Sequence, residues 1–272
     1  MSYLRSKLTS RLGFSLIELL IAAVIGSIAV TAGFQLFINQ NQTHIIQANI
    51  SDMQQNARSA VDELVGKIRQ AGYRLPIGVK CIRAWNSNPD TLAIAYMAEP
   101  ICTARLSQSM ASPSAELKCA SSDLANFPQD IWAYAYDPAT QTGEYFYVSS
   151  VVTTTHQIYH ALAPLSKSYP LNSQVLVLSF YKFYVDRSDT LHPRLMVVQN
   201  GEAPTVYSDN IEDLQFRYVL ASGLVYDTVA VDRYVRQVEV QVVARTEKND
   251  LFMHQYRRDT LFTSVMVRNL GM

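Results

Sequence analysis

A single acidic residue, Glu18, lies near the start of an otherwise apolar run that spans residues 14–38. An ionised carboxylate costs about 2.5–3.5 kcal/mol at the centre of a membrane-spanning helix, and less near its end. Glu18 therefore needs a partner. The free N–H groups and the dipole of a helix that begins at Phe14 would supply one. Cleavage between Gly13 and Phe14 would add a full positive charge, the new α-ammonium group.

The sequence around this acid resembles the class III signal of type IV prepilins and pseudopilins. The match runs from Gly13 to Leu20, Gly-Phe-Ser-Leu-Ile-Glu-Leu-Leu, behind a short basic leader. The resemblance implies that a prepilin peptidase cleaves after Gly13 and methylates the new N-terminal residue, Phe14. It also implies that Glu18 neutralises the amine of a neighbouring subunit during filament assembly. Ser15 stands where the family more often has threonine, another small hydroxyl residue.

Two other interpretations account for the apolar run itself. In a conventional signal peptide a small-residue cleavage site follows the apolar stretch, and residues 30–32 would fit, but the run continues to Ile38. In an uncleaved anchor, about 25 helical residues would reach about 37 Å and cross the hydrocarbon core. Neither interpretation explains why an acid lies four residues after Phe14.

Composition and charge limit the class of protein. The chain has 272 residues, and without residues 1–13 it keeps 20 basic and 23 acidic residues, which argues against a dedicated nucleic-acid binder. The basic residues of the leader place it in the cytoplasm and the rest of the chain in the periplasm or outside. Sixteen tyrosines and many β-branched residues favour a sheet-rich domain there.

One long helix is predicted over residues 14–71. No proline occurs in residues 1–75, and Gly72 followed by Pro76 gives a stop signal. The helix would be about 87 Å long. After Asn39 an apolar stripe with helical spacing indicates an amphipathic half that covers a sheet. The stripe consists of Ile46, Ile50, Met53, Ala57, Val61, Leu64 and Ile68.

Small residues form a second pattern within the apolar run. Ala22, Gly26, Ala29 and Gly33 follow a 4-3-4 spacing and make one smooth helix face. Small residues let helices approach closely where no hydrophobic force drives their association. The pattern suits a filament core packed from many helices, although incidental small residues in a lone anchor would look the same.

The rest of the chain reads as antiparallel strands. Alternation of apolar and polar side chains is clearest in residues 211–220 and 235–245. Residues 103–130 are poor in large apolar side chains and are expected to form a surface excursion. The other predicted strands are residues 91–97, 131–136, 144–152, 157–162, 174–185, 195–198 and 256–267.

Three segments near the C-terminus resemble PilW-type minor pilins. They are residues 209–218, 235–242 and 262–269, in the same order as in that family. Residues 80–170 show no matching motif. The resemblance implies an inner-membrane minor pilin that helps prime pilus assembly at or near the tip. Its implied partners are other minor pilins, the major pilin, a large adhesin-like tip protein and the inner-membrane assembly platform.

Three cysteines, Cys81, Cys102 and Cys119, would lie in an oxidising compartment. Cys102 and Cys119 bracket a polar stretch and are predicted to pair, which leaves Cys81 over. Three unbonded buried thiols are the alternative. The spacing does not resemble a zinc site.

No catalytic motif occurs in the sequence, so no enzyme, cofactor or metal is predicted. His156 and His160 are four residues apart but lack a third ligand, so solvent-facing histidines are expected. Asp209, Glu212 and Asp213 could ligate calcium, but a turn followed by an acidic strand edge explains them equally well.

The sequence therefore predicts an α+β fold of the type IV pilin kind, with a long N-terminal helix packed on a C-terminal antiparallel sheet domain. Residues 1–13 would be a leader, 14–38 a membrane-spanning and filament-core helix, 39–72 its amphipathic half, and 73–272 a periplasmic domain. The predicted function is that of a minor pilin in the inner membrane and then the pilus, supporting twitching motility and adhesion. A J-type pseudopilin of type II secretion is the nearest alternative. A membrane-tethered periplasmic binding protein or enzyme is an alternative of another class.

Overall fold

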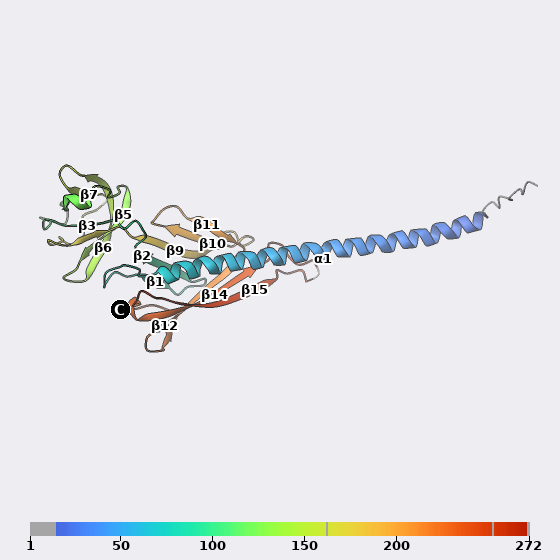
Figure 1. Cartoon of the computed structure of the whole chain (residues 1–272). Helices are drawn as coiled ribbons and strands as arrows, with labels where there is room; N and C mark the ends of the chain where they lie inside the picture. The colour runs from blue at the N-terminus through green and yellow to red at the C-terminus, as the bar shows by residue number, and fades with distance from the viewer. Residues whose placement is uncertain (1–14, 162, 252, 271–272) are drawn as a thin grey trace, which may run out of the picture.

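A computed structural model describes residues 15–161, 163–251 and 253–270. The helix α1 (Leu16–Gln70) has 55 residues, about 83 Å at 1.5 Å per residue. Its N-terminal half projects away from a body of antiparallel sheets, and its C-terminal half lies along that body (Figure 1). The α+β architecture, one long N-terminal helix on antiparallel sheets, is as predicted.

The described strands form three sheets, in which all pairs of neighbours are antiparallel. The five-stranded sheet has the order β1 (Ile82–Trp85), β2 (Thr91–Tyr96), β9 (Ser179–Asp186), β10 (Arg194–Gln199) and β11 (Thr205–Asp209). The four-stranded sheet has the order β13 (Val225–Tyr226), β12 (Ile211–Leu220), β14 (Val235–Arg245) and β15 (Arg258–Met266). The six-stranded sheet has the order β3 (Thr103–Arg105), β8 (Gln174–Leu176), β5 (Ile131–Asp137), β6 (Thr142–Val152), β7 (Gln157–Ala161) and β4 (Leu117–Lys118). Two short 3-10 helices are η1 (Ser121–Asp123) and η2 (Asp232–Tyr234).

The amphipathic half of α1 provides one wall of the main core. It contacts β14 and β15 of one sheet and β2 and β11 of the other. The predicted stripe is confirmed, because its members are buried or pack against the core, and Ala60 joins them. On the facing strands, the alternating residues of β12 and β14 point into the same core. These are Leu214, Phe216 and Tyr218, and Val238, Val240 and Val242.

The C-terminal end of α1 is held by hydrogen bonds to β2 and to a residue near the end of the chain. Gly72 adopts a φ of +77°, which favours glycine, and its N–H donates to Ala95 O at 3.0 Å. The side-chain amide of Asn269 donates to Arg69 O at 3.2 Å and to Ala71 O at 3.4 Å. The last turn thus finds partners for carbonyls that a helix end leaves free.

A buried carboxylate, Asp90, joins the two sheets of the main body. Its Oδ2 accepts from Phe216 N–H and its Oδ1 from Ser87 N–H, both at 2.9 Å. Its own N–H donates to Leu214 O at 2.8 Å. Burial raises the pKa of this carboxyl. Strand β13 pairs with β12 only at Tyr218 and Val219. Asp90 provides hydrogen-bond partners for Leu214 and Phe216, which β13 does not reach.

The six-stranded sheet is built only from the consecutive strands β3 to β8. The chain leaves after β2 and returns at β9, where Tyr96 pairs directly with Ser179. Residues 97–178 therefore form a unit between two paired strands, here called the insertion unit. It lies at the end of the body farthest from the start of α1 (Figure 1).

Two predictions about this region are wrong. Residues 103–130 are not a surface excursion, because Leu106, Leu117 and Leu124 are fully buried in the insertion unit's own core. The strands there are two or three residues long, so no sequence periodicity marks them. The predicted strand at residues 174–185 is two strands, β8 and β9, which belong to different sheets.

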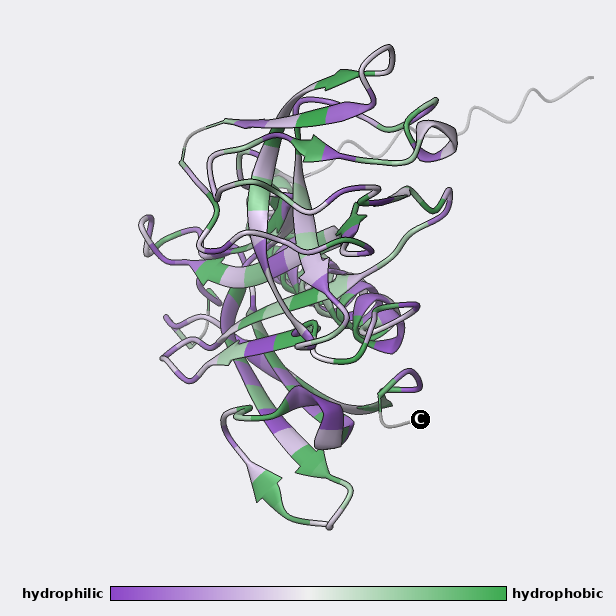
Figure 2. Ribbon diagram, turned by 90° about the vertical axis from the view of Figure 1, so that its left-hand side faces the viewer, coloured by the Kyte–Doolittle hydropathy of each residue, from purple (hydrophilic) through white to green (hydrophobic). Residues whose placement is uncertain are grey.

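The hairpin of β12 and β13 projects from the lower side of the body in Figure 1. Figure 2 shows that the residues near its end are hydrophobic. Leu224, Val225 and Tyr226 there are about half exposed.

Candidate functional site in the N-terminal half of the helix

Glu18 occupies the first turn of α1, as the sequence predicts. Ser15 is the N-cap residue, with extended backbone, and its N–H donates to Glu18 Oε2 at 2.9 Å. The Ser15 carbonyl accepts from Leu19 N–H at 3.2 Å and starts the helical ladder. A carboxylate at this position also interacts favourably with the positive end of the helix dipole. The helix N-terminus is thus one partner of the acid.

The Glu18 carboxylate can accept further hydrogen bonds or an ion pair. Its carboxylate makes no other hydrogen bond or ion pair with the residues that the structure describes. An ionised carboxylate can accept about four hydrogen bonds. Gly13 and Phe14, the predicted cleavage and methylation site, lie outside the described residues.

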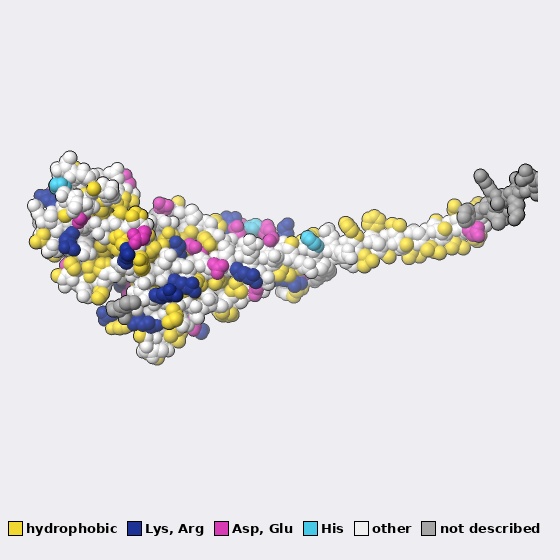
Figure 3. Space-filling model, in the orientation of Figure 1, with side chains coloured by type: hydrophobic (Ala, Val, Ile, Leu, Met, Phe, Trp, Pro, Cys, Tyr) yellow, Lys and Arg dark blue, Asp and Glu magenta, His cyan; other side chains and the backbone are white. Residues whose placement is uncertain are grey.

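The surface of the helix between residues 15 and 41 is exposed throughout. Leu16 is 82% exposed and Phe37 66% exposed, and Figure 3 shows hydrophobic side chains along this arm. Within the described chain, this is the helix long and apolar enough to cross a membrane. The fold itself covers none of it, and lipid or other helices would remove this apolar surface from water.

The hydroxyl groups on this arm are satisfied within the helix. Ser27 Oγ donates to Val24 O, and Thr31 Oγ1 donates to Ser27 O, both at 2.8 Å. Thr43 Oγ1 does the same to Asn39 O at 2.9 Å. These bonds let polar residues enter an apolar environment without an unpaired donor. Ser and Thr at helix-interior positions are the sequence signal for these bonds, which were not predicted.

The fold gives no internal reason for the two glycines on the smooth face. A Cβ atom placed on Gly26 or Gly33 would meet nothing within 4 Å. Glycine at an exposed helix position costs about 0.5–1 kcal/mol relative to alanine. Close approach of another helix would offset this cost.

The predicted disulfide between Cys102 and Cys119 is not formed, since all three cysteines are free thiols. Cys119 pairs across with Leu106. Cys102 lies four residues before Leu106 along an extended segment, which is about 13 Å. A disulfide requires Cα atoms within about 7 Å. Burial raises the pKa of the Cys119 thiol to about 12, so this cysteine is a packed side chain.

The other residues that could have bound a metal have protein partners instead. Asp209 pairs with Arg194 at 3.2 Å, and Asp213 pairs with Arg187 at 3.3 Å. Glu212 accepts from Arg258, with Nη2 to Oε1 at 2.9 Å. His160 Nε2 lies 3.1 Å from Ala115 O. No group of three or more potential ligands comes together among the described residues.

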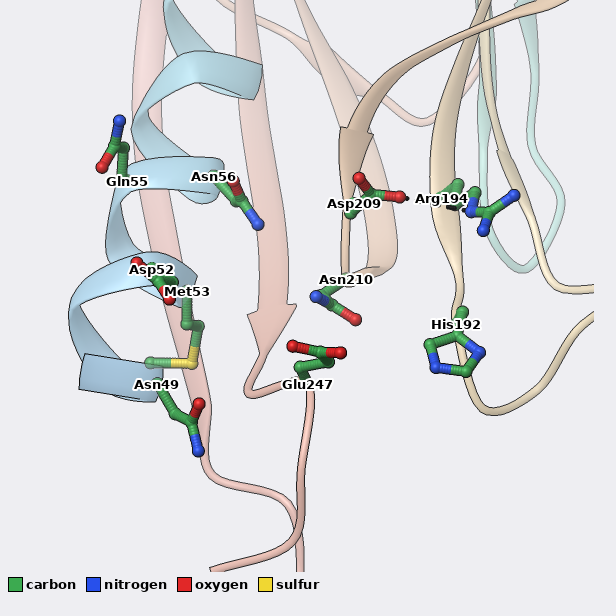
Figure 4. A pocket seen from close by; sticks show the side chains of 10 residues that line it. All are labelled: Asn49, Asp52, Met53, Gln55, Asn56, His192, Arg194, Asp209, Asn210 and Glu247. Atoms are coloured by element: carbon green, nitrogen blue, oxygen red, sulfur yellow. Dashed lines mark ion pairs between the residues drawn. The ribbon is translucent and has the colours of Figure 1, made fainter. Parts of the chain in front are cut away.

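A polar groove of about 530 Å³ lies where α1 meets the body. Figure 4 shows Asn49, Asp52 and Asn56 of the helix facing Asp209, Asn210 and Glu247, with the ion pair between Arg194 and Asp209 drawn. The arm therefore changes from an apolar to a polar surface where it reaches the body. Such a boundary is expected where a helix leaves a membrane.

A known family motif coincides with the N-terminal site. Residues 8–34 match the family model described as the prokaryotic N-terminal methylation motif. Among solved structures, a type IV-like pilin from Thermus thermophilus is similar over 82% of this chain and 99% of that chain, with 10% identity and a TM-score of 0.40. No curated protein matches the chain. The chain thus carries a prokaryotic methylation motif that includes Gly13, Phe14 and Glu18.

Proposed function

We propose that the chain is a minor pilin, a structural subunit that helps prime type IV pilus assembly at or near the tip. The observation that carries the proposal is the methylation motif at residues 8–34, which leads into a helical arm that the fold leaves uncovered. Such an arm suits a subunit that is first held in a membrane and then packed among other helices.

In this proposal each part of the chain has one task. Residues 1–13 are a cytoplasmic leader that a prepilin peptidase removes after Gly13, and Phe14 is then methylated. Residues 14–38 anchor the chain in the inner membrane, and residues 39–72 carry the body. Residues 73–272 fold in the periplasm and reach the cell surface in the pilus.

In assembly, the carboxylate of Glu18 would accept a second partner. The N–H of Ser15 holds the carboxylate at the start of the helix, and the amine of a neighbouring subunit's first residue supplies the opposite charge. Pairing lowers the cost of keeping either charge in an apolar bundle. Ala22, Gly26, Ala29 and Gly33 give the neighbouring helix a surface to approach.

The partners that follow are the prepilin peptidase, the assembly platform, the major pilin, other minor pilins and an adhesin-like tip protein. The position at the tip, with its support of twitching motility and adhesion, rests on the PilW-like segments near the C-terminus.

Mass spectrometry of purified pili tests the proposal. We expect the chain there without residues 1–13 and with a methylated Phe14. In Gly13→Val, processing should fail and leave a precursor thirteen residues longer, while Leu12→Val serves as the matched control and should be processed. An identical mature mass in Gly13→Val, or trimming near Ala32, would refute the site.

Deletion of the gene tests the filament to which the subunit belongs. Loss of pili and of twitching motility is expected. Loss of type II secretion with normal pili would show a pseudopilin of the J type instead. Normal pili and normal secretion would favour a membrane-tethered binding protein or enzyme.

A further inference from the structure

A cleft of about 690 Å³ lies between the insertion unit and the five-stranded sheet, here called the junction cleft. Its lining includes Lys80, Arg83, Trp85, Tyr134, Glu144 and Tyr145. An adjoining apolar pocket of about 170 Å³ is lined by Trp132, Leu178, Phe180 and Gly201. Arg83 and Tyr145 line both spaces. The combined size is that of a small-molecule site.

Arg83 in this cleft is a cation without an anion. Its side chain is half-buried, and its guanidinium lies 5.3 Å from the centre of the Tyr145 ring. It makes no hydrogen bond or ion pair with any residue that the structure describes. A guanidinium offers five N–H donors in a planar fork that matches a carboxylate or a phosphate. An unpaired, half-buried arginine is therefore a binding group for an anion.

The acid that lines the cleft makes no ion pair with Arg83, because its carboxylate accepts hydrogen bonds from other residues. Glu144 Oε1 accepts from Ser166 Oγ at 2.7 Å and from the Tyr169 hydroxyl at 3.1 Å. Ser166 N–H also donates to this carboxylate, at 2.9 Å. Lys80, the other cation on the wall, has no acidic partner among the described residues. With Lys80 and Arg83 against the single carboxylate of Glu144, the residues that line the cleft carry a net positive charge.

Tyr145 adds an unused donor. Its hydroxyl oxygen is buried and has no hydrogen-bond partner within the described part of the chain. Burial raises the pKa of this phenol to about 12, so the group stays neutral and able to donate. An unpaired buried hydroxyl costs about 1–3 kcal/mol, and native proteins leave few of them. A ligand oxygen would satisfy it after a small shift of the neighbouring side chains, because the hydroxyl oxygen itself is not solvent-exposed.

Two indole rings flank these polar groups. Trp85 is 45% exposed in the junction cleft, and Trp132 is 40% exposed in the adjoining pocket. Exposed aromatic rings beside a few fixed polar groups are typical of ligand sites. The apolar face of a pyranose ring stacks on such an indole, and its hydroxyls meet the surrounding donors.

A peptide strand fits the cleft less well. Strand β1 is the sheet edge beside the cleft, but Asp232 Oδ2 accepts from Cys81 N–H at 2.6 Å and from Ile82 N–H at 3.4 Å. The N–H groups of Cys81 and Ile82 are therefore not available to a further strand, and β1 ends at Trp85. Strands are usually five or six residues long, so addition of a strand would gain few hydrogen bonds here.

We propose that the junction cleft binds an acidic saccharide, a pyranose that carries a carboxylate. The carboxylate pairs with Arg83, the ring lies against Trp85, and an apolar substituent enters the pocket beside Trp132. This inference does not depend on the proposed role in pili, because all of its residues lie in the body.

The test uses the full chain in detergent micelles, titrated with methyl β-D-glucuronide and with the neutral methyl β-D-glucoside, and followed by saturation-transfer NMR. We expect the glucuronide to bind roughly tenfold or more tightly than the glucoside. Arg83→Gln should remove this preference. Arg217→Gln, which changes an arginine on the outer face of another sheet, should keep it.

A second variant separates ligand binding from folding. Tyr145→Phe removes only the unpaired hydroxyl, so the melting temperature should stay the same or rise. Glucuronide binding should weaken severalfold. Equal binding of the two glycosides, binding of neither, or an unchanged preference in Arg83→Gln would overturn the proposal. So would Arg83-dependent binding of a hexaglutamate peptide without binding of the glucuronide, which would show a protein partner instead.

Discussion

The charged side chains of this molecule differ in how their charge is balanced. Glu18 is held by a backbone N–H at the helix start, and Glu212 lies among three arginines, Arg187, Arg245 and Arg258. Arg83 has neither kind of partner among the described residues. Buried or half-buried charges are normally compensated, so an uncompensated one indicates an interaction with another molecule.

Glu18→Val tests the assembly role at this scale. The variant should still be anchored in the membrane, because its span becomes more apolar, but it cannot pair with a neighbouring amine. We expect its incorporation into pili to fall at least tenfold, measured by immunoblotting of sheared pili. Thr31→Val places the same residue in the same span and should be incorporated normally. Unchanged piliation and motility in Glu18→Val would discredit the assembly role.

Glu212 predicts a pH dependence of stability. The hydrogen bond from Arg258 is the largest cause that lowers its pKa from the ordinary value of 4.5. The folded state therefore favours the charged form, and the added stability is fully present above about pH 4.5 and is lost as the pH falls through the folded-state pKa.

Glu212→Gln should then lower the free energy of unfolding by about 1–2 kcal/mol at neutral pH, and by progressively less below pH 4.5. Urea denaturation of the solubilised chain between pH 3 and 7 measures this. Glu247→Gln, at an exposed acid, is the control. A difference that stays constant over the range would contradict the linkage.

At the scale of elements, the end of α1 offers a matched pair of glycines. Gly72 has a φ of +77°, and a Cβ atom there would lie 2.9 Å from Leu270 Cδ2, whereas a Cβ on Gly66 within the helix would meet nothing within 4 Å. Gly72→Ala should destabilise the body by about 1–2 kcal/mol. Gly66→Ala should stabilise it by about 0.5–1 kcal/mol. Thermal unfolding followed by circular dichroism checks both signs, and equal shifts would show that the helix end is not strained.

The elements with strong periodicity were predictable from the sequence. The stripe on α1 recurs every three or four residues, and β12 and β14 alternate between apolar and polar residues. All three are long enough for this spacing to be recognised in the sequence, and both strands match their predicted bounds. Strands β3 and β4 are too short for any period. The break between β8 and β9 is set by which sheet each half joins, and that depends on distant residues.

The same limit applies to the sites. The acid near the chain start is a local pattern, so Gly13, Phe14 and Glu18 could be proposed from sequence alone. The junction cleft joins Arg83 of β1 to Tyr145 of β6, and only the packing of the insertion unit on the sheet brings them together. Asn269 likewise lies in one of the PilW-like segments, but its contact with the end of α1 could not be predicted without the structure.

At the scale of the whole molecule, the insertion unit should be removable. Tyr96 pairs with Ser179, so an Asn-Gly turn in place of residues 97–178 would join β2 and β9 as a hairpin. We expect the shortened chain to keep the helix packed on both main sheets. Its melting temperature should fall, because Phe180 loses its contact with Tyr145, whose ring centre lies 6.2 Å away.

Circular dichroism and limited proteolysis of the shortened chain provide the measurement. It should also lose the glucuronide preference while it still enters pili. Unfolding of the whole body would show that the unit is integral to the fold.

The position of β14 and β15 has a consequence for how the molecule is made. The apolar stripe of α1 is synthesised early, but much of its partner surface lies in residues 235–266, near the other end of the chain. In the proposed export to the periplasm, the stripe would stay uncovered until nearly the whole polypeptide had crossed the membrane. In that case a periplasmic chaperone, or temporary residence at the lipid surface, would protect it during that interval, and loss of β15 would leave part of the stripe uncovered.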